Sequence, residues 1–204
     1  MTNSTANSQM SSIPADKCAV LVVGVQNEFV SPKGDGFVGG NISEVLSKMN
    51  GLLERARSAN VKAIIYLQSV RRKDSPEFTF YKLAPHLIEG TWNSEFVELL
   101  KPKKGDAIVR TESYDCFGRT EMEKVLKKLD VTPCEDHVVV MGGSINVSIY
   151  QCVIGLSQRH YYVSVPLDCT YGPEEVRRLA LDTLESSSYD YNVTLTDSEK
   201  VEFK

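Results

Sequence analysis

The 204-residue sequence has no long apolar run. Its hydrophobic stretches are short, such as residues 18–23, whereas a membrane-spanning helix needs about 20 consecutive apolar residues. The chain also has no excess of basic residues, since 23 Lys and Arg against 27 Asp and Glu give a formal net charge of −4. The lack of a long apolar run predicts no membrane span. The negative net charge argues against nucleic acid or an anionic membrane surface as the main partner.

Cysteine is scarce and scattered. The five cysteines are an odd number, and no two of them have the Cys-x-x-Cys spacing. This distribution is typical of reduced thiols and excludes a disulfide framework or a zinc site as the basis of the fold. The positions are Cys18, Cys116, Cys134, Cys152 and Cys169.

The N-terminal segment lacks the basic and apolar regions of a signal peptide. Residues 1–16 are polar and rich in Ser, Thr and Asn, so we expect a disordered leader in front of one domain over residues 17–204. The 42% hydrophobic and 25% charged content is that of a globular domain, which excludes wholesale disorder. A cytoplasmic location is the default expectation, and export by an unconventional route stays open.

From residue 17 onward, short apolar runs alternate with segments of helical period, which predicts stacked βαβ units around a parallel sheet. The predicted strands are residues 18–24, 62–68, 107–111, 137–141, 162–166 and 192–195. The predicted helices are residues 42–59, 122–129, 147–157 and 174–187. Residues 69–93 show no clear period, and a loop of this length in a compact domain is typically a lid or a pocket wall.

In an open parallel sheet, ligands bind beyond the carboxyl ends of the strands. The segments at these ends are the candidate site, namely residues 24–29, 68–72, 111–117 and 142–148.

Four stretches of the sequence, three of which overlap these segments, resemble one protein family. Residues 22–29 (Val-Val-Gly-Val-Gln-Asn-Glu-Phe) resemble the first-strand motif of the isochorismatase-like cysteine hydrolases. Residues 89–92 with 100–106, residues 114–120, and residues 142–148 followed by Asp168 resemble its later motifs in the same order. The resemblance covers nearly the whole chain after residue 17. It implies a Rossmann-like three-layer α/β/α fold with a six-stranded, mainly parallel sheet, in agreement with the pattern of strands and helices.

The resemblance also implies a catalytic Asp, Lys and Cys, and all three positions are substituted here. The Asp position is Gly24, the Lys position is Thr111 and the Cys position is Ser148. The flanking residues keep the pattern of the family.

These substitutions remove the chemistry that the family uses. A serine hydroxyl needs an adjacent base to act as a nucleophile, and we expect none beside Ser148 because His86, His137 and His160 all lie outside the four segments. Cleavage of a vinyl ether needs a general acid, which Gly24 cannot supply. Residues 68–71 also lack the Asp-x-His motif of the nicotinamidases in the family, so we expect no metal and no cofactor.

Eight residues near the strand ends are candidates for ligand binding. Arginines there can pair with a ligand carboxylate, aromatic residues can line an apolar pocket, and glutamines can bond a ligand or close a loop. The resemblance implies a cis peptide at Gly143–Ser144, which would direct backbone N–H groups toward the ligand. The candidates are Gln26, Gln68, Arg71, Trp92, Arg110, Tyr114, Ser144 and Tyr150.

Several functions remain open at this point. The first is a parent activity of isochorismate hydrolysis, giving a dihydroxybenzoate and pyruvate, that is disabled or strongly impaired at Gly24, Thr111 and Ser148. The second is a natural pseudoenzyme that binds a small metabolite or a protein partner. An amide hydrolase of the same family and a serine hydrolase with rearranged machinery are the others. We expect a small carboxylate or amide ligand and a homo-oligomer.

Overall fold

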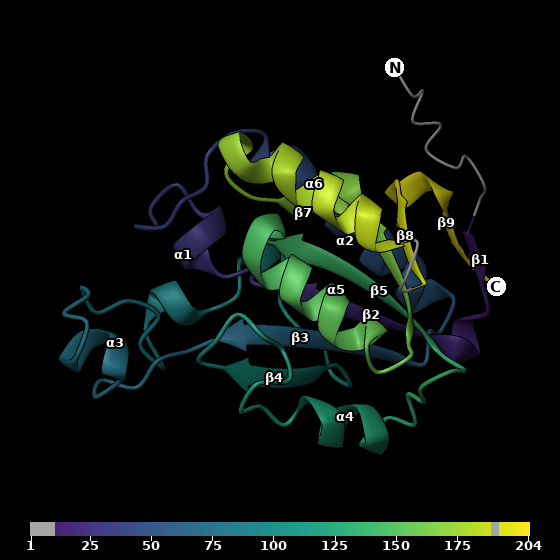
Figure 1. The fold of residues 1–204 in the computed structure, drawn as a ribbon, viewed down its shortest axis with the longest axis horizontal. Coiled ribbons are helices and arrows are strands. Elements are labelled where there is room, and N and C mark those ends of the chain that lie inside the picture. The colour runs from purple at the N-terminus through teal and green to yellow at the C-terminus, as the bar shows by residue number, and fades with distance from the viewer. Residues whose placement is uncertain (1–10, 189–191) are drawn as a thin grey trace.

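The computed structural model describes residues 11–188 and 192–204. Its main sheet has the strand order β4-β3-β2-β5-β6-β8, and every pairing in it is parallel (Figure 1). Each of the six predicted strands is present, which confirms the prediction. The strands are β2 (Cys18–Val23), β3 (Ala63–Ser69), β4 (Ala107–Thr111), β5 (His137–Gly143), β6 (Tyr162–Pro166) and β8 (Val193–Thr196).

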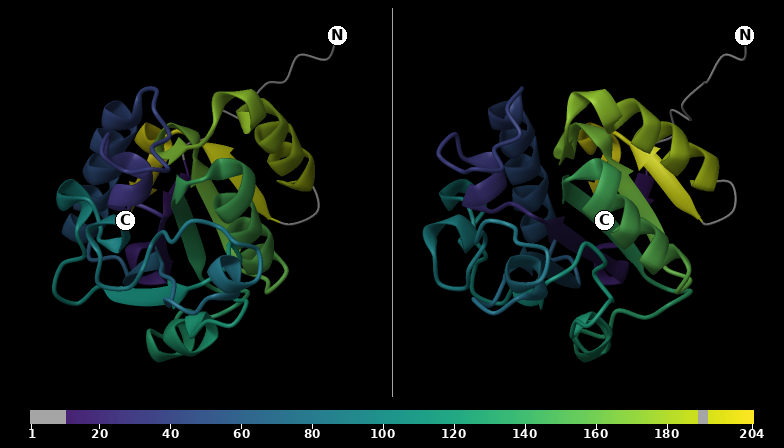
Figure 2. Two further views of the ribbon diagram at one scale, coloured as in Figure 1. Left: turned by 90° about the vertical axis from the view of Figure 1, so that its left-hand side faces the viewer. Right: turned by 60° about the vertical axis from the view of Figure 1, so that its left-hand side comes forward.

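Helices cover both faces of this sheet. The six side chains of β2 are all buried and alternate between two cores, because successive residues of a strand point to opposite faces. Figure 2 shows α2 on one side and α5 and α6 on the other, which confirms the three-layer fold. One outer layer contains α2 (Ile42–Ser58). The other contains α4 (Met122–Lys128), α5 (Tyr150–Ser157) and α6 (Glu174–Ser188).

The strand order reverses between β2 and β5, which is the place where a doubly wound sheet opens a ligand-binding crevice. β2 leads through Gly24 to α1 (Asn27–Val30). β5 leads to a π-helical turn, η4 (Ile145–Ile149), that continues directly into α5. A short strand that the sequence pattern did not predict, β7 (Thr170–Tyr171), pairs with the end of β5.

The two chain ends form a second, small sheet. β1 (Ser11–Ile13) pairs in parallel with β9 (Val201–Phe203), and the Ile13 side chain is buried. Residues 11–16 are therefore ordered rather than part of a disordered leader, because they bury apolar surface against the C-terminal strand. Residues 1–10 lie outside the described part of the chain.

Short helical turns complete the structure. The loop over residues 69–93 contains α3 (Pro76–Thr79) and the start of η2 (Trp92–Ser94). None of the helices in the described residues is long and apolar enough to cross a bilayer. The remaining turns are η1 (Ala15–Lys17), η3 (Glu98–Leu100), η5 (Leu167–Cys169) and η6 (Ser198–Lys200).

Candidate ligand-binding site

A cavity of about 270 Å³ lies at the point where the strand order reverses, and we call it the inner cavity. The ends of β2 and β5, the turn η4, the loop over residues 69–93 and the segment that follows β7 form its wall. No carboxylate side chain is found among its lining residues in the described parts of the chain. The wall consists of Gly24, Phe29, Val38, Ser69, Arg71, His86, Leu87, Tyr114, Gly143, Ser144, Asn146, Val147, Ser148, Tyr171 and Pro173.

Gly24 has a backbone conformation that favours glycine. Its φ is +68°, in the left-handed region, and a Cβ atom added there would lie 2.6 Å from the carbonyl oxygen of Gly143. The same Cβ would lie 3.1 Å from the hydroxyl of Tyr171. An aspartate therefore does not fit at this position unless the backbone moves.

Tyr171 fills the space beside Gly24. Its hydroxyl donates a 2.6 Å hydrogen bond to the carbonyl oxygen of Gly24, and its ring packs so closely on Gly143 that a Cβ there would come within 2.4 Å of it. The side chain is buried, and burial raises the pKa of the Tyr171 phenol above its ordinary value. The phenol is therefore a neutral hydrogen-bond donor and a very weak acid.

Thr111 does not line the inner cavity. Its hydroxyl donates to the carbonyl oxygen of Ser113 and accepts from the N–H of Ser113, each at 2.9 Å, so the side chain closes the turn after β4. Its carbonyl oxygen is 3.4 Å from Nη1 of Arg71. The positive charge beside the end of β4 thus comes from the neighbouring strand end, not from residue 111.

Arg71 is buried in the cavity wall, with 5% of the residue exposed. Its Nε donates to Oε2 of Glu77 at 2.7 Å, and Nη1 reaches the carbonyl oxygens of Val70 and Thr111 at 3.3 and 3.4 Å. This ion pair and the carbonyl contacts hold the guanidinium in one place.

Ser148 lies in η4, on the cavity wall, and is half-buried. Upstream of it, the Gly143–Ser144 peptide is cis, and the Ser144 hydroxyl donates to Oδ1 of Asn146. No hydrogen bond to the Ser148 hydroxyl is found among the described residues. The hydroxyl is therefore available to a ligand.

His86 also reaches the inner cavity, contrary to our expectation that no histidine would lie near Ser148. The loop over residues 69–93 folds back over the strand ends and brings the imidazole there. However, both ring nitrogens face other groups: Nδ1 is 2.9 Å from the carbonyl oxygen of Ala84, and Nε2 is 3.8 Å from Oε2 of Glu77. The ring is thus oriented toward the loop and Glu77 rather than toward Ser148.

Five of the predicted ligand-binding residues lie outside the cavity wall. The buried amide of Gln26 bonds the main chain of Ser69 and the carbonyl oxygen of Ser94, and Gln68 donates to that same carbonyl oxygen. The other three residues also face elsewhere: Trp92 is 43% exposed at the surface, Arg110 pairs with Glu89 at the surface, and Tyr150 packs against the core. Arg71, Tyr114 and Ser144 do line the cavity.

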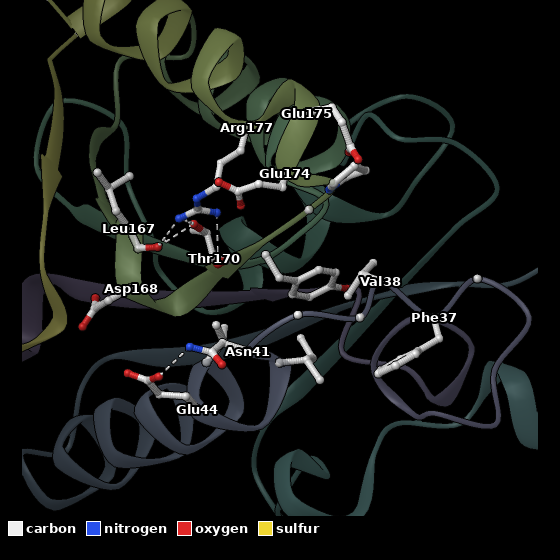
Figure 3. A pocket seen from close by; sticks show the side chains of 18 of the residues that line it. Phe37, Val38, Asn41, Glu44, Leu167, Asp168, Thr170, Glu174, Glu175 and Arg177 are labelled. Atoms are coloured by element: carbon white, nitrogen blue, oxygen red, sulfur yellow. Dashed lines mark hydrogen bonds between the residues drawn. The ribbon is translucent and has the colours of Figure 1, made fainter.

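A larger, more open cavity of about 760 Å³ adjoins the first, and we call it the outer cavity (Figure 3). The two share Val38, Tyr171 and Pro173. The outer cavity is mainly acidic, and its two basic side chains already have partners, since Arg177 donates to main-chain carbonyls and Lys48 pairs with Asp168. Gly24 and Ser148 line the inner cavity and not the outer one, so the inner cavity is the candidate site.

A comparison with models of protein families identifies the family of this chain. Residues 18–200 match the model of the Isochorismatase domain. The chain belongs to this family.

Two relatives with similar sequences carry the name of an amide hydrolase. The ureidoacrylate amidohydrolase RutB of Caulobacter segnis is 28% identical over 206 residues, which cover 85% of this chain and 82% of that protein. RutB of Azorhizobium caulinodans is 26% identical and covers 86% of each chain.

Two solved structures share the fold. An isochorismatase-like hydrolase from Alkaliphilus metalliredigens superposes with a TM-score of 0.79 at 23% identity, over 90% of this chain and 96% of that one. N-carbamoylsarcosine amidase from Thermoplasma acidophilum gives a TM-score of 0.74 at 19% identity, over 91% and 99%.

Four polar residues of the inner cavity are not among the predicted site residues: Ser69, His86, Asn146 and Tyr171. Asn146 lies within residues 142–148, and its signal in the sequence is a side-chain amide two positions before Ser148. His86 lay in the loop that was predicted to be a pocket wall. Tyr171 carried no local signal, because its place beside Gly24 depends on the pairing of β7 with β5.

Proposed function

We propose that this chain is an Isochorismatase-family protein that binds a small carboxylate or amide in the inner cavity without hydrolysing it. The observation that carries the proposal is the packing of Tyr171 against Gly24, because it occupies the space into which an acid at position 24 would extend.

The chemistry of the wall supports the same conclusion. Hydrolysis of an amide through a nucleophile needs a base to accept its proton, and the inner cavity has no carboxylate among its described lining residues. His86 faces Ala84 and Glu77, and the Tyr171 phenol is too weak an acid to protonate an enol carbon. Loss of one member of a coupled catalytic set typically lowers the rate by roughly 10⁴-fold or more.

The relatives favour an origin among amide hydrolases rather than among enzymes that cleave isochorismate. RutB acts on ureidoacrylate, and the structural neighbour from Thermoplasma acidophilum is an N-carbamoylsarcosine amidase. We therefore take ureidoacrylate as the first ligand to test. It carries both a carboxylate and an amide-like urea.

The test is a proton NMR time course of ureidoacrylate, isochorismate and a panel of small amides with the purified chain. RutB of Caulobacter segnis serves as the positive control for ureidoacrylate. We expect the substrate signals to persist with this chain and to disappear with RutB. Turnover that is abolished by Ser148→Ala would overturn the proposal and establish a serine hydrolase.

A further inference from the structure

Arg71 carries the single permanent charge among the described residues that line the inner cavity. A buried guanidinium is costly unless its N–H groups have partners, so the hydrogen bonds of this side chain can be accounted for one nitrogen at a time. Nε is bonded to Glu77, and Nη1 makes two long contacts with the main chain.

Nη2 of Arg71 has no hydrogen-bond partner among the described residues. Among the described residues, two polar side-chain atoms are buried from solvent and have no hydrogen-bond partner, namely Nε of Arg57 and the hydroxyl oxygen of Tyr66. Nη2 of Arg71 is not one of these two atoms. Nη2 is therefore not sealed. Since Arg71 lines the inner cavity and only 5% of the residue is exposed, we infer that Nη2 faces the cavity.

The wall of the inner cavity also carries uncharged donors. Oδ1 of Asn146 accepts from Ser144, which leaves the amide nitrogen of Asn146 free of partners among the described residues. The Ser148 hydroxyl likewise has no hydrogen-bond partner among the described residues. These two donors suit a carbonyl oxygen, and the apolar side chains of Phe29, Leu87 and Val147 lie on the same wall.

We propose that the inner cavity selects a monocarboxylate that also carries an amide or urea carbonyl. The carboxylate binds Nη2 of Arg71, and the carbonyl accepts hydrogen bonds from Asn146 and Ser148. Arg71 is paired with Glu77 through Nε, and its remaining nitrogen Nη2 can bind one ligand carboxylate; a charge-assisted hydrogen bond to this fixed guanidinium discriminates a carboxylate from a primary amide of the same shape. This inference rests on the proposed function and defines the ligand class of the same site.

The test compares a matched pair of ligands, ureidoacrylate and its primary amide, by isothermal titration calorimetry. With the unaltered chain, we expect the amide to bind at least about tenfold more weakly than the acid. Arg71→Gln removes this preference. Arg72→Gln is the matched control, because Arg72 is the adjacent arginine, its side chain is 68% exposed and it does not line the cavity. We expect this variant to keep the preference.

A second variant, at Glu77, is expected to strengthen binding of the acid, whereas Arg71→Gln weakens it. Glu77→Gln removes the negative charge beside Arg71 and keeps a carbonyl oxygen as acceptor for Nε. We expect it to strengthen binding of the acid by about threefold and to leave binding of the amide unchanged, because the field at Nη2 becomes more positive. If Glu77 were purely structural, the substitution would weaken both ligands alike.

The outcomes separate the two proposals. Equal binding of acid and amide by the unaltered chain, or an acid preference that persists in Arg71→Gln, overturns the carboxylate inference and leaves the proposed function intact. Binding of neither ligand, or turnover of either one, overturns the proposed function and this inference with it.

Discussion

The hydroxyl of Tyr171 donates a hydrogen bond of 2.6 Å to the carbonyl oxygen of Gly24, although the two residues are 147 positions apart in the sequence. The contact forms where the ends of β2, β5 and β7 meet. Glycine at position 24 suits this contact, since a Cβ there would lie 3.1 Å from the Tyr171 hydroxyl and 2.6 Å from the carbonyl oxygen of Gly143.

A side chain at position 24 should destabilise the fold more than its backbone angle alone explains. Gly24 and Gly39 have φ values of +68° and +69°, but nothing lies within 4 Å of a Cβ built on Gly39. We expect Gly39→Ala to lower the free energy of unfolding by about 1–2 kcal/mol and Gly24→Ala by roughly 2 kcal/mol more. Urea denaturation of both variants measures the difference. Equal losses would contradict the close approach of Gly143.

Tyr171→Phe should remove the buried hydrogen bond to Gly24. We expect the free energy of unfolding to fall by about 1 kcal/mol, because one buried hydrogen bond is lost while the carbonyl oxygen of Gly24 keeps the N–H of Gln26 as a donor, at 2.8 Å. The control is Tyr161→Phe, which removes a longer hydrogen bond, of 3.2 Å, to Val131 at a distant buried site. The larger loss is expected for Tyr171→Phe, and a larger loss for Tyr161→Phe would contradict it.

The raised pKa of the Tyr171 phenol also predicts a pH dependence. The unfolded chain releases this proton near pH 10 whereas the folded chain retains it, so the contribution of Tyr171 to stability is present below pH 10 and is lost as the pH rises. The difference in unfolding free energy between the unaltered chain and Tyr171→Phe should therefore shrink above pH 10. A constant difference up to pH 11.5 would show that the phenol ionises normally.

Replacing all three substituted positions should not restore hydrolysis. In the variant Gly24→Asp, Thr111→Lys, Ser148→Cys, the aspartate meets Gly143 and Tyr171, and the lysine replaces the hydroxyl that closes the turn after β4. We expect no turnover of ureidoacrylate and a lower stability than in the single variant Ser148→Cys. Turnover by the triple variant would show that the backbone around Gly24 adapts freely to a side chain.

His137 should make the fold sensitive to acid. Burial lowers the pKa of this imidazole to about 4, and Nε2 lies 2.8 Å from the hydroxyl of Ser164. The unfolded chain takes up this proton near pH 6.5 and the folded chain only near pH 4, so stability is full above pH 6.5 and falls by about 3 kcal/mol as the pH approaches 4.

The measurement is the unfolding free energy between pH 7 and pH 4. His137→Gln should be flatter than the unaltered chain over this range. The exposed His160, which has a positive φ that Asn tolerates, gives the control His160→Asn, for which we expect the slope to be unchanged. A steep slope that persists in His137→Gln would assign the acid sensitivity to other groups.

The sheet could be predicted from the sequence because its signal is local. Continuous apolar runs such as residues 18–23 are typical of strands that are buried on both faces, and the structure places them there. The pairing of β1 with β9 could not be predicted, because it joins two short segments from opposite ends of the chain.

The site was predictable in position and less so in its contacts. The strand ends led to Gly24, Arg71, Ser144 and Ser148, all of which line the inner cavity. Sequence position alone did not show which arginine faces inward: Arg71 is buried, whereas Arg110 is exposed and paired with Glu89. Tyr171 depends on a contact between distant strands, and no local pattern encodes such a contact.

The central claim is that the inner cavity binds its ligand without converting it, and one calorimetric titration of ureidoacrylate into the unaltered chain tests both parts. We expect a saturable series of injection heats, each returning to the baseline, since binding releases heat once and turnover would continue to do so. A sustained heat signal after each injection would reveal hydrolysis and contradict the account. An absence of any binding heat at several temperatures would contradict it as well, because the cavity would then lack the ligand proposed for it.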